Sequence, residues 1–280
     1  MINSLIDIPD SSKLCDTRKK KDLNKYTYSK YLRKDVIKNL KTCIIDSKIE
    51  ESCYWGAELI SSGFIWELMI ELSYIACKHI NIYNPYISKY IYIENSFLLN
   101  IVQLYGRNKL LDLRNNQSIR NHFCEFICIL ALSKKNEIPN IPTYKNKDLN
   151  NTFDILLKKI DEKILYISTK DTVLLISKLL NFAKYINVYE KIWDIIKKKL
   201  NTIPIQKGKN INYLYKTFKN FNTKKKNLNN SLLLFAISIM KNTVKNSENF
   251  IKNKKLIQAC INVNILYKKI KDDFIKHPNN

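Results

Sequence analysis

The sequence predicts an all-α protein, built as an irregular multi-helix bundle or a short helical solenoid of about ten helices. Apolar residues recur at helical spacing from about Ser29 to Phe274, with little of the sustained alternation that a half-buried strand requires. The chain has only four glycines in 280 residues, which disfavours sheets joined by tight hairpins. Hydrophobic residues make up 45% of the chain, enough for a sizeable core.

The same periodicity predicts the individual helices. In chain order they span residues 29–45, 52–61, 64–80, 85–104, 117–133, 151–165, 170–184, 187–200, 210–220, 230–245 and 249–274. Gly63 is expected to cap one helix and to make the tight turn into the next. Pro85 suits the first turn of the following helix, where its missing N–H costs nothing.

Two of these helices are expected to be central. In 64–80 and in 117–133 the polar residues fall on one narrow strip, and apolar residues cover the rest of the circumference. A helix of this kind is typically surrounded by other helices. We expect the core there to contain Trp55, Trp66, Phe123 and Phe126.

Polar and proline-rich breaks divide the chain. Residues 133–151, with Pro139 and Pro142, favour a linker, and further breaks are expected at 201–210 and 223–230. The predicted division is therefore a basic N-terminal segment (1–28), a charge-neutral helical core module (29–143) and a Lys-rich helical module (144–280).

The positive charge is concentrated in the last part of the chain. The net charge is +23, yet residues 51–140 carry 8 basic and 8 acidic side chains, whereas residues 141–280 carry 28 basic and 10 acidic ones. A field of this kind selects acidic partners rather than a fold. All 28 basic residues after position 140 are lysines, which suit phosphate as point charges, whereas the reading of base edges favours arginine.

The candidate nucleic-acid-binding residues are the clustered lysines of this region. They are Lys197, Lys198, Lys199, Lys207, Lys209, Lys216, Lys219, Lys224, Lys225 and Lys226. Interleaved aromatic residues could act as stacking platforms for single strands, but their helical spacing equally suits a core-facing stripe. These aromatics are Tyr213, Tyr215, Phe218 and Phe221. A merely solvated lysine surface is the other interpretation that remains open.

No motif indicates an enzyme. The four glycines form no phosphate-binding loop, no nucleophile elbow is present, and the chain has three histidines. Glu67 and Glu71, at i and i+4, could act as acid and base or hold a cation. Pairing with an arginine is the simpler interpretation, and the candidates are Arg107, Arg114 and Arg120. We predict a non-enzymatic protein with no cofactor.

Cysteine usage predicts a reducing, intracellular environment. The chain has seven cysteines at irregular spacing, and no apolar run is long enough for a membrane span. The segments Cys77-Lys-His79 and His122-Phe-Cys124, with Cys128 one turn further, carry zinc-ligand chemistry. Because they lie within apolar helices, packed core thiols are the preferred interpretation, and no metal site is predicted.

Part of the chain resembles a known family. The residues concerned are Glu51-Ser-Cys-Tyr-Trp-Gly-Ala-Glu-Leu-Ile-Ser-Ser-Gly, Trp66-Glu-Leu, Asn84-Pro85, and Ile119-Arg120-Asn121 through Ser133-Lys134. Over about residues 50–143 the chain resembles an uncharacterised protein family of nucleocytoplasmic large DNA viruses. The resemblance implies a virus-encoded protein of the host cytoplasm or the virion, and it transfers no catalytic residue.

Two functions follow as expectations. The first is a non-enzymatic helical protein that binds the phosphates of DNA or RNA without strong sequence specificity. The alternative is a helical structural or adaptor protein of a viral particle or replication site, in which the basic surface docks acidic protein partners. Neither function includes a membrane partner.

Overall fold

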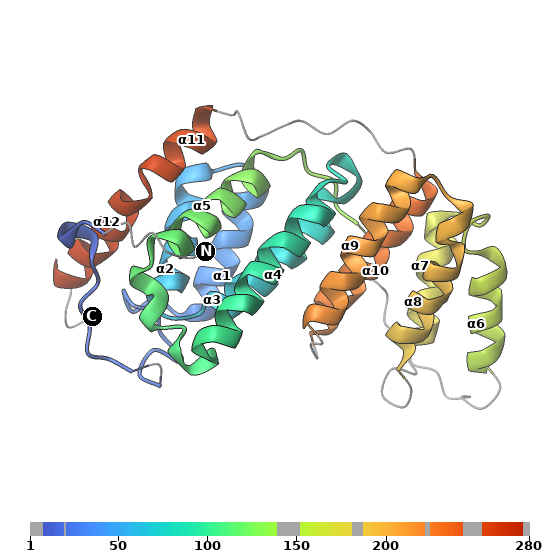
Figure 1. The fold of residues 1–280 in the computed structure, drawn as a ribbon, viewed down its shortest axis with the longest axis horizontal. Helices are drawn as coiled ribbons and strands as arrows, with labels where there is room; N and C mark the ends of the chain where they lie inside the picture. The colour runs from blue at the N-terminus through green and yellow to red at the C-terminus, as the bar shows by residue number, and fades with distance from the viewer. Residues whose placement is uncertain are drawn as a thin grey trace. The chain divides into compact units, whose positions relative to one another are not determined.

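The computed structural model describes residues 8–19, 21–138, 152–180, 187–221, 225–242 and 254–276. These residues form twelve α-helices joined by short 3₁₀ and π segments (Figure 1). The extended pairing within the described ranges is a single bridge between Tyr26 and Leu32. The predicted all-α class is therefore confirmed.

Most helix bounds fall close to the predicted ones. The helices are α1 (Arg33–Ile45), α2 (Ile49–Ser61), α3 (Ile65–Ile75), α4 (Ile87–Tyr105), α5 (Gln117–Leu132), α6 (Thr152–Lys163), α7 (Thr169–Leu180), α8 (Val188–Lys198), α9 (Ile205–Phe221), α10 (Lys226–Lys241), α11 (Lys254–Ile261) and α12 (Val263–Lys276). A π segment, η2 (Ala76–Ile80), follows α3 directly, and a 3₁₀ turn, η6 (Lys199–Thr202), follows α8.

Three differences from the predicted helices have local causes. The first helix starts at Arg33 because Lys30 has a φ of 64°, which interrupts any earlier helix. The break expected at 201–210 is wrong beyond Pro204, since α9 begins at Ile205 and Gly208 lies inside it. The helix expected at 249–274 is divided at Asn262 into α11 and α12.

The helices group into two compact units. Unit 1 comprises residues 1–75, 94–134 and 248–280, and unit 2 comprises residues 76–93 and 135–247. This boundary differs from the predicted division at residue 143, because α11 and α12 pack on α5 and α2 of unit 1. Their buried side chains Leu256, Val263 and Tyr267 are the physical reason for this assignment.

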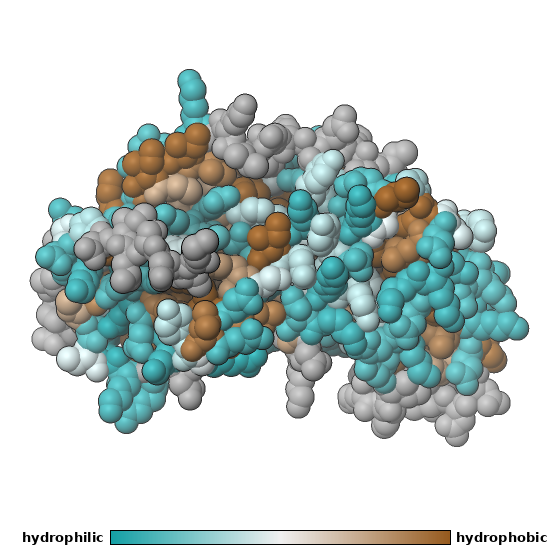
Figure 2. Space-filling view, in the orientation of Figure 1, coloured by the Kyte–Doolittle hydropathy of each residue, from teal (hydrophilic) through white to brown (hydrophobic). Residues whose placement is uncertain are grey.

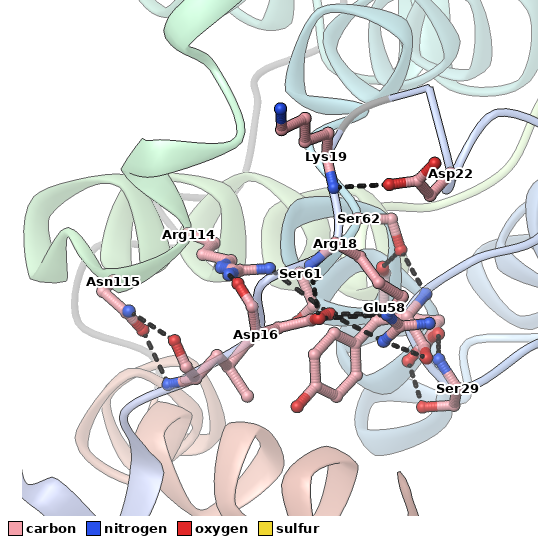
Figure 3. Close-up of polar contacts among 12 residues, drawn as sticks. Asp16, Arg18, Lys19, Asp22, Ser29, Glu58, Ser61, Ser62, Arg114 and Asn115 are labelled. Carbon is pink, nitrogen blue, oxygen red and sulfur yellow. Dashed lines mark hydrogen bonds and ion pairs between the residues drawn. The ribbon is translucent and has the colours of Figure 1, made fainter. Parts of the chain in front are cut away.

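The N-terminal segment also belongs to unit 1, although its sequence predicted a separate basic segment. Leu14, Leu23 and Tyr28 are buried. Asp16 forms a 2.7 Å ion pair with Arg18, and the Arg114 guanidinium donates to the Asp16 carbonyl oxygen at 2.8 Å (Figure 3). The segment is thus fixed by both apolar and polar contacts.

The core of unit 1 contains the predicted phenylalanines but not the predicted tryptophans. Phe123 and Phe126 are buried on α5. Trp55 and Trp66 are half-buried, and the Arg107 guanidinium covers the Trp66 ring at 4.5 Å. The two tryptophans therefore lie at the rim of the core, where a large ring can be partly covered by a neighbouring cation.

Unit 2 is built around α10 and Trp193. Residues 231–240 of α10 are all buried, as expected for a helix that is apolar on nearly all sides. α9, α7, α8 and η2 pack against α10. Trp193 of α8 is fully buried and contacts the rings of Tyr215 and Phe218 on α9. Among the described helices of the chain, none is long and apolar enough to cross a membrane.

Candidate nucleic-acid interface

The predicted lysines that the structure describes all lie in unit 2. Lys197, Lys198 and Lys199 follow one another from the end of α8 into η6. Lys207, Lys209, Lys216 and Lys219 are on α9, while Lys225 and Lys226 begin α10. Lys224 lies outside the described residues. Figure 2 shows hydrophilic side chains gathered over the part of unit 2 that contains α8 and α9.

The amphipathic pattern of α9 separates its lysines from the core. Ile211, Leu214 and Phe218 are buried on one side of the helix. Lys209, Lys216 and Lys219, at spacings of seven and three residues, are exposed on the opposite side. Lys207 falls on the buried side and is half-buried; its ammonium group donates to the Met240 carbonyl oxygen at 3.4 Å. Lys207 is therefore the member of the predicted set that caps a neighbouring helix.

Of the interleaved aromatics, two face the core and two lie at its edge, where they could still act as stacking platforms. Phe218 and Phe221 are 8% and 4% exposed, so they belong to the core. Tyr213 and Tyr215 are half-buried at its edge. The Lys197 ammonium lies 4.7 Å from the centre of the Tyr215 ring and that of Lys219 lies 5.9 Å from it. The Tyr215 ring thus contacts lysines from two helices.

A second lysine–tyrosine contact joins α9 to α4. The Lys216 ammonium is 5.4 Å from the centre of the Tyr92 ring, which in turn lies 5.5 Å from the ring of Tyr213. Tyr92 was not predicted as part of this surface, because it comes from α4 and no local pattern links it to α9. Cations at this distance are attracted to the ring faces.

Three of the predicted lysines form ion pairs. Lys219 lies 2.8 Å from Glu190, Lys199 lies 3.1 Å from Asp161 and Lys197 lies 3.8 Å from Asp194. The hydrogen bond to Glu190 raises the pKa of Lys219, so this lysine stays protonated at neutral pH. Only the Asp194–Lys197 pair, at i and i+3, could have been found from local spacing. Surface pairs of this kind are weak and can be exchanged for another anion.

Five exposed lysines of the predicted set have no carboxylate partner within the described ranges: Lys198, Lys209, Lys216, Lys225 and Lys226. Their surroundings are poor in acidic groups, because the sequence from residue 195 to residue 247 contains no Asp or Glu. Lys225 is the N-cap of α10, and it makes no side-chain cap hydrogen bond. The positive end of the α10 dipole therefore adds to the charge of these lysines.

The contacts that the structure describes for the three predicted arginines do not include Glu67. Arg114 approaches Asp16 at 3.8 Å, and Arg107 covers Trp66. Arg120 is fully buried and donates to oxygen atoms of Arg114, Ser12, Asn115 and Asn264. Within the described part of the chain, none of these arginines forms an ion pair with Glu67.

The two histidines considered as zinc ligands, His79 and His122, belong to different units. Cys77 and His79 belong to η2 of unit 2, whereas α5, with Cys124 and Cys128, belongs to unit 1. His122 on α5 faces Glu94 at 3.2 Å and stacks on Phe97. The combination of these residues that was considered, and not preferred, from the sequence is therefore not formed within either unit.

Comparisons of this chain with protein-family models, curated proteins and solved structures find no match.

Proposed function

We propose that unit 2 binds the phosphates of DNA or RNA, without enzymatic activity and without strong sequence specificity. The binding surface, called the lysine face below, consists of the exposed lysines of α8, α9 and the start of α10. They are Lys197, Lys198, Lys209, Lys216, Lys219, Lys225 and Lys226. The observation that carries the proposal is that five of these seven lysines lack a carboxylate partner among the described residues, and that the sequence from residue 195 to residue 247 has no acidic residue.

Lysine chemistry supports phosphate contacts rather than base reading. A lysine ammonium is a flexible point charge, and the lysine face contains no arginine that could make a bidentate contact with a base. The half-buried Tyr215 lies beneath Lys197 and Lys219 and could contribute ring contacts to unpaired bases. A virus-encoded origin remains a further proposal from the resemblance of residues 50–143 alone.

The test is the salt dependence of binding to labelled single-stranded DNA, single-stranded RNA and duplex DNA. Each neutralised phosphate should contribute a slope of about −0.7 to −0.9 to log affinity against log salt. Replacing Lys198, Lys209, Lys225 and Lys226 together by alanine should weaken binding to all sequences alike, by roughly tenfold or more at low salt. The salt slope should become shallower by about 3 in the same variant.

A matched control removes four exposed lysines elsewhere in the same unit: Lys158, Lys159, Lys163 and Lys170 on α6 and α7. These lysines alternate with carboxylates, and Lys158 lies 3.9 Å from Glu162. The control variant should therefore retain most of the affinity. Equal losses in both variants, or the absence of any salt-sensitive binding by the wild-type chain, would contradict the proposed activity. If a polyglutamate column retains the wild-type chain as strongly as a nucleic-acid column does, the result would instead support the docking of acidic proteins.

A further inference from the structure

Four of the seven cysteines converge in unit 1 from three helices. Cys53 comes from α2, Cys124 and Cys128 from α5, and Cys260 from α11. The Sγ atoms of Cys53 and Cys128 are 3.5 Å apart, and those of Cys124 and Cys53 are 3.9 Å apart. The Cys260 thiol lies near Cys124, one turn of α11 from Leu256, but it is outside the group of three whose Sγ atoms lie closest together. Cys53 and Cys128, which are 75 residues apart in the sequence, thus place their sulfur atoms in direct contact.

These distances match a tetrahedral metal site. With a Zn–S bond of about 2.3 Å, neighbouring sulfur atoms of a tetrahedron lie about 3.8 Å apart. The three Sγ atoms of Cys53, Cys124 and Cys128 all lie within 4.8 Å of one another. Cys124 and Cys128 also have the i, i+4 relation that lets one helix offer two ligands on one face.

Ordinary burial of thiols accounts less well for this cluster. Cys77 illustrates the ordinary case: it is fully buried in unit 2, and burial alone raises its pKa. A disulfide would require a sulfur–sulfur distance near 2.05 Å, and all seven cysteines are free. A disulfide would also use only two of the four converging thiols.

The surroundings of the cluster suit a negatively charged group. Arg120 lies one turn before Cys124 on α5, is fully buried, and has no carboxylate partner among the residues described. Its guanidinium lies 3.7 Å from the centre of the Tyr267 ring. The Tyr267 hydroxyl is buried without a hydrogen-bond partner and is within electrostatic range of Cys124 and Cys53. Four thiolates around a divalent ion carry excess negative charge, and Arg120 is a buried cation on the same helix as Cys124 and Cys128.

A path from solvent reaches the cluster. A cavity of about 540 Å³ is lined by Cys53 and by Gln258 and Ala259 of α11. Glu50 and Glu51 also line this cavity, and their carboxylates would attract a cation toward it. An entry route is one of the requirements for a site that is loaded after folding.

We propose that Cys53, Cys124 and Cys128 bind one Zn²⁺ and that the neighbouring Cys260 completes a tetrahedral thiolate site. On binding, each of the four thiols loses its proton to solvent and forms one Zn–S bond, with no change in oxidation state. A bound ion would join α11 to α2 and α5, and so would anchor the C-terminal helices to unit 1. This site is independent of the lysine face.

The first experiment measures metal in the full-length chain purified under reducing conditions. We expect about one zinc ion per chain, and on replacement by Co²⁺ the visible absorption bands and sulfur-to-cobalt charge transfer of a tetrahedral thiolate complex. Cys124→Ser and Cys128→Ser should lower bound zinc to near zero. The controls Cys43→Ser and Cys77→Ser replace cysteines outside the cluster and should retain the full metal content.

A second experiment needs no variant and so does not depend on the folding of one. The wild-type chain is alkylated with and without a chelator, and each modified cysteine is identified by mass spectrometry. Zinc should protect Cys53, Cys124, Cys128 and Cys260, whereas the modification of Cys15 and Cys43 should not depend on the chelator. Absence of stoichiometric zinc after loading, iron in its place, a Cys53–Cys128 disulfide in the reduced preparation, or zinc retained by Cys124→Ser would each overturn the proposed site.

Discussion

Asp16 is the residue that fixes the N-terminal segment to unit 1 by charge. Its side chain is 5% exposed, accepts hydrogen bonds from the Arg18 side chain and backbone, and lies 3.8 Å from Arg114. Burial by itself raises the pKa of this carboxyl, but the hydrogen bonds from Arg18 outweigh it and hold the pKa below its ordinary value. The carboxylate form is therefore the one that stabilises the fold.

Replacing Asp16 by Asn should lower the free energy of unfolding at pH 7 by about 2 kcal/mol, because both arginines lose their anionic partner. Since the folded pKa lies below the unfolded value of 3.8, this contribution is fully present above that pH and is lost as pH falls through the folded pKa. Urea unfolding at pH 7 and near pH 3 tests this prediction. The difference in the free energy of unfolding between Asp16→Asn and wild type should be smaller at the lower pH.

Asp22→Asn is the matched control for Asp16. Asp22 is exposed and accepts one hydrogen bond from the Lys19 backbone N–H. Its replacement should cost far less at both pH values. Similar losses for the two variants would show that the buried network of Figure 3 does not depend on the Asp16 charge.

At the scale of elements, the α2–α3 turn depends on Gly63. Its φ is 74°, and its N–H donates to the Ile60 carbonyl oxygen at 3.0 Å. A Cβ atom at this position would meet the Cα and Cβ of Leu111 at 3.1 Å. Both the left-handed backbone and the lack of space therefore require glycine here.

Gly63→Ala should destabilise the protein by roughly 2–3 kcal/mol, because strain at a positive φ adds to the clash with Leu111. Gly106→Ala provides the comparison: its φ is 78°, but nothing lies within 4 Å of an added Cβ. The Gly106 backbone, with a ψ of 152°, lies in a region that is essentially restricted to glycine, so its variant should lose roughly 1–3 kcal/mol from strain alone in urea unfolding. A loss of no more than about 1 kcal/mol for Gly63→Ala would mean that the Leu111 contact relaxes without cost.

At the scale of the whole molecule, each unit has its own core. Trp193 is fully buried in unit 2, and Phe126 is fully buried in unit 1. Truncating such a side chain leaves a cavity and costs about 3–5 kcal/mol. Because the truncated side chain and its cavity belong to one unit, the loss of stability should be greatest within that unit.

Trp193→Ala should therefore reduce the hydrogen-exchange protection of amides in α8, α9 and α10, while α1, α2 and α5 keep theirs. Phe126→Ala should give the opposite pattern. Uniform loss of protection in both variants would show that the two units unfold as one cooperative body.

The sequence alone determined the helices and the distribution of charge. Helical periodicity is a local property, so the ranges of α2, α5 and α8 could be predicted within a few residues. The exposure of Lys209, Lys216 and Lys219 on α9 likewise follows from their spacing against Ile211 and Leu214. The splitting of the last helix at Asn262 was not visible in this pattern, because apolar residues continue on both sides of it.

Only the tertiary structure decided which distant residues meet. Cys53 and Cys128 are 75 residues apart in the sequence, and their contact depends on how α2 packs on α5. The same packing assigns α11 and α12 to unit 1 and leaves Arg120 buried among amide, hydroxyl and carbonyl oxygens. Helix formation depends on neighbours three and four residues away, whereas helix pairing depends on the fit of whole apolar surfaces, which no local spacing encodes.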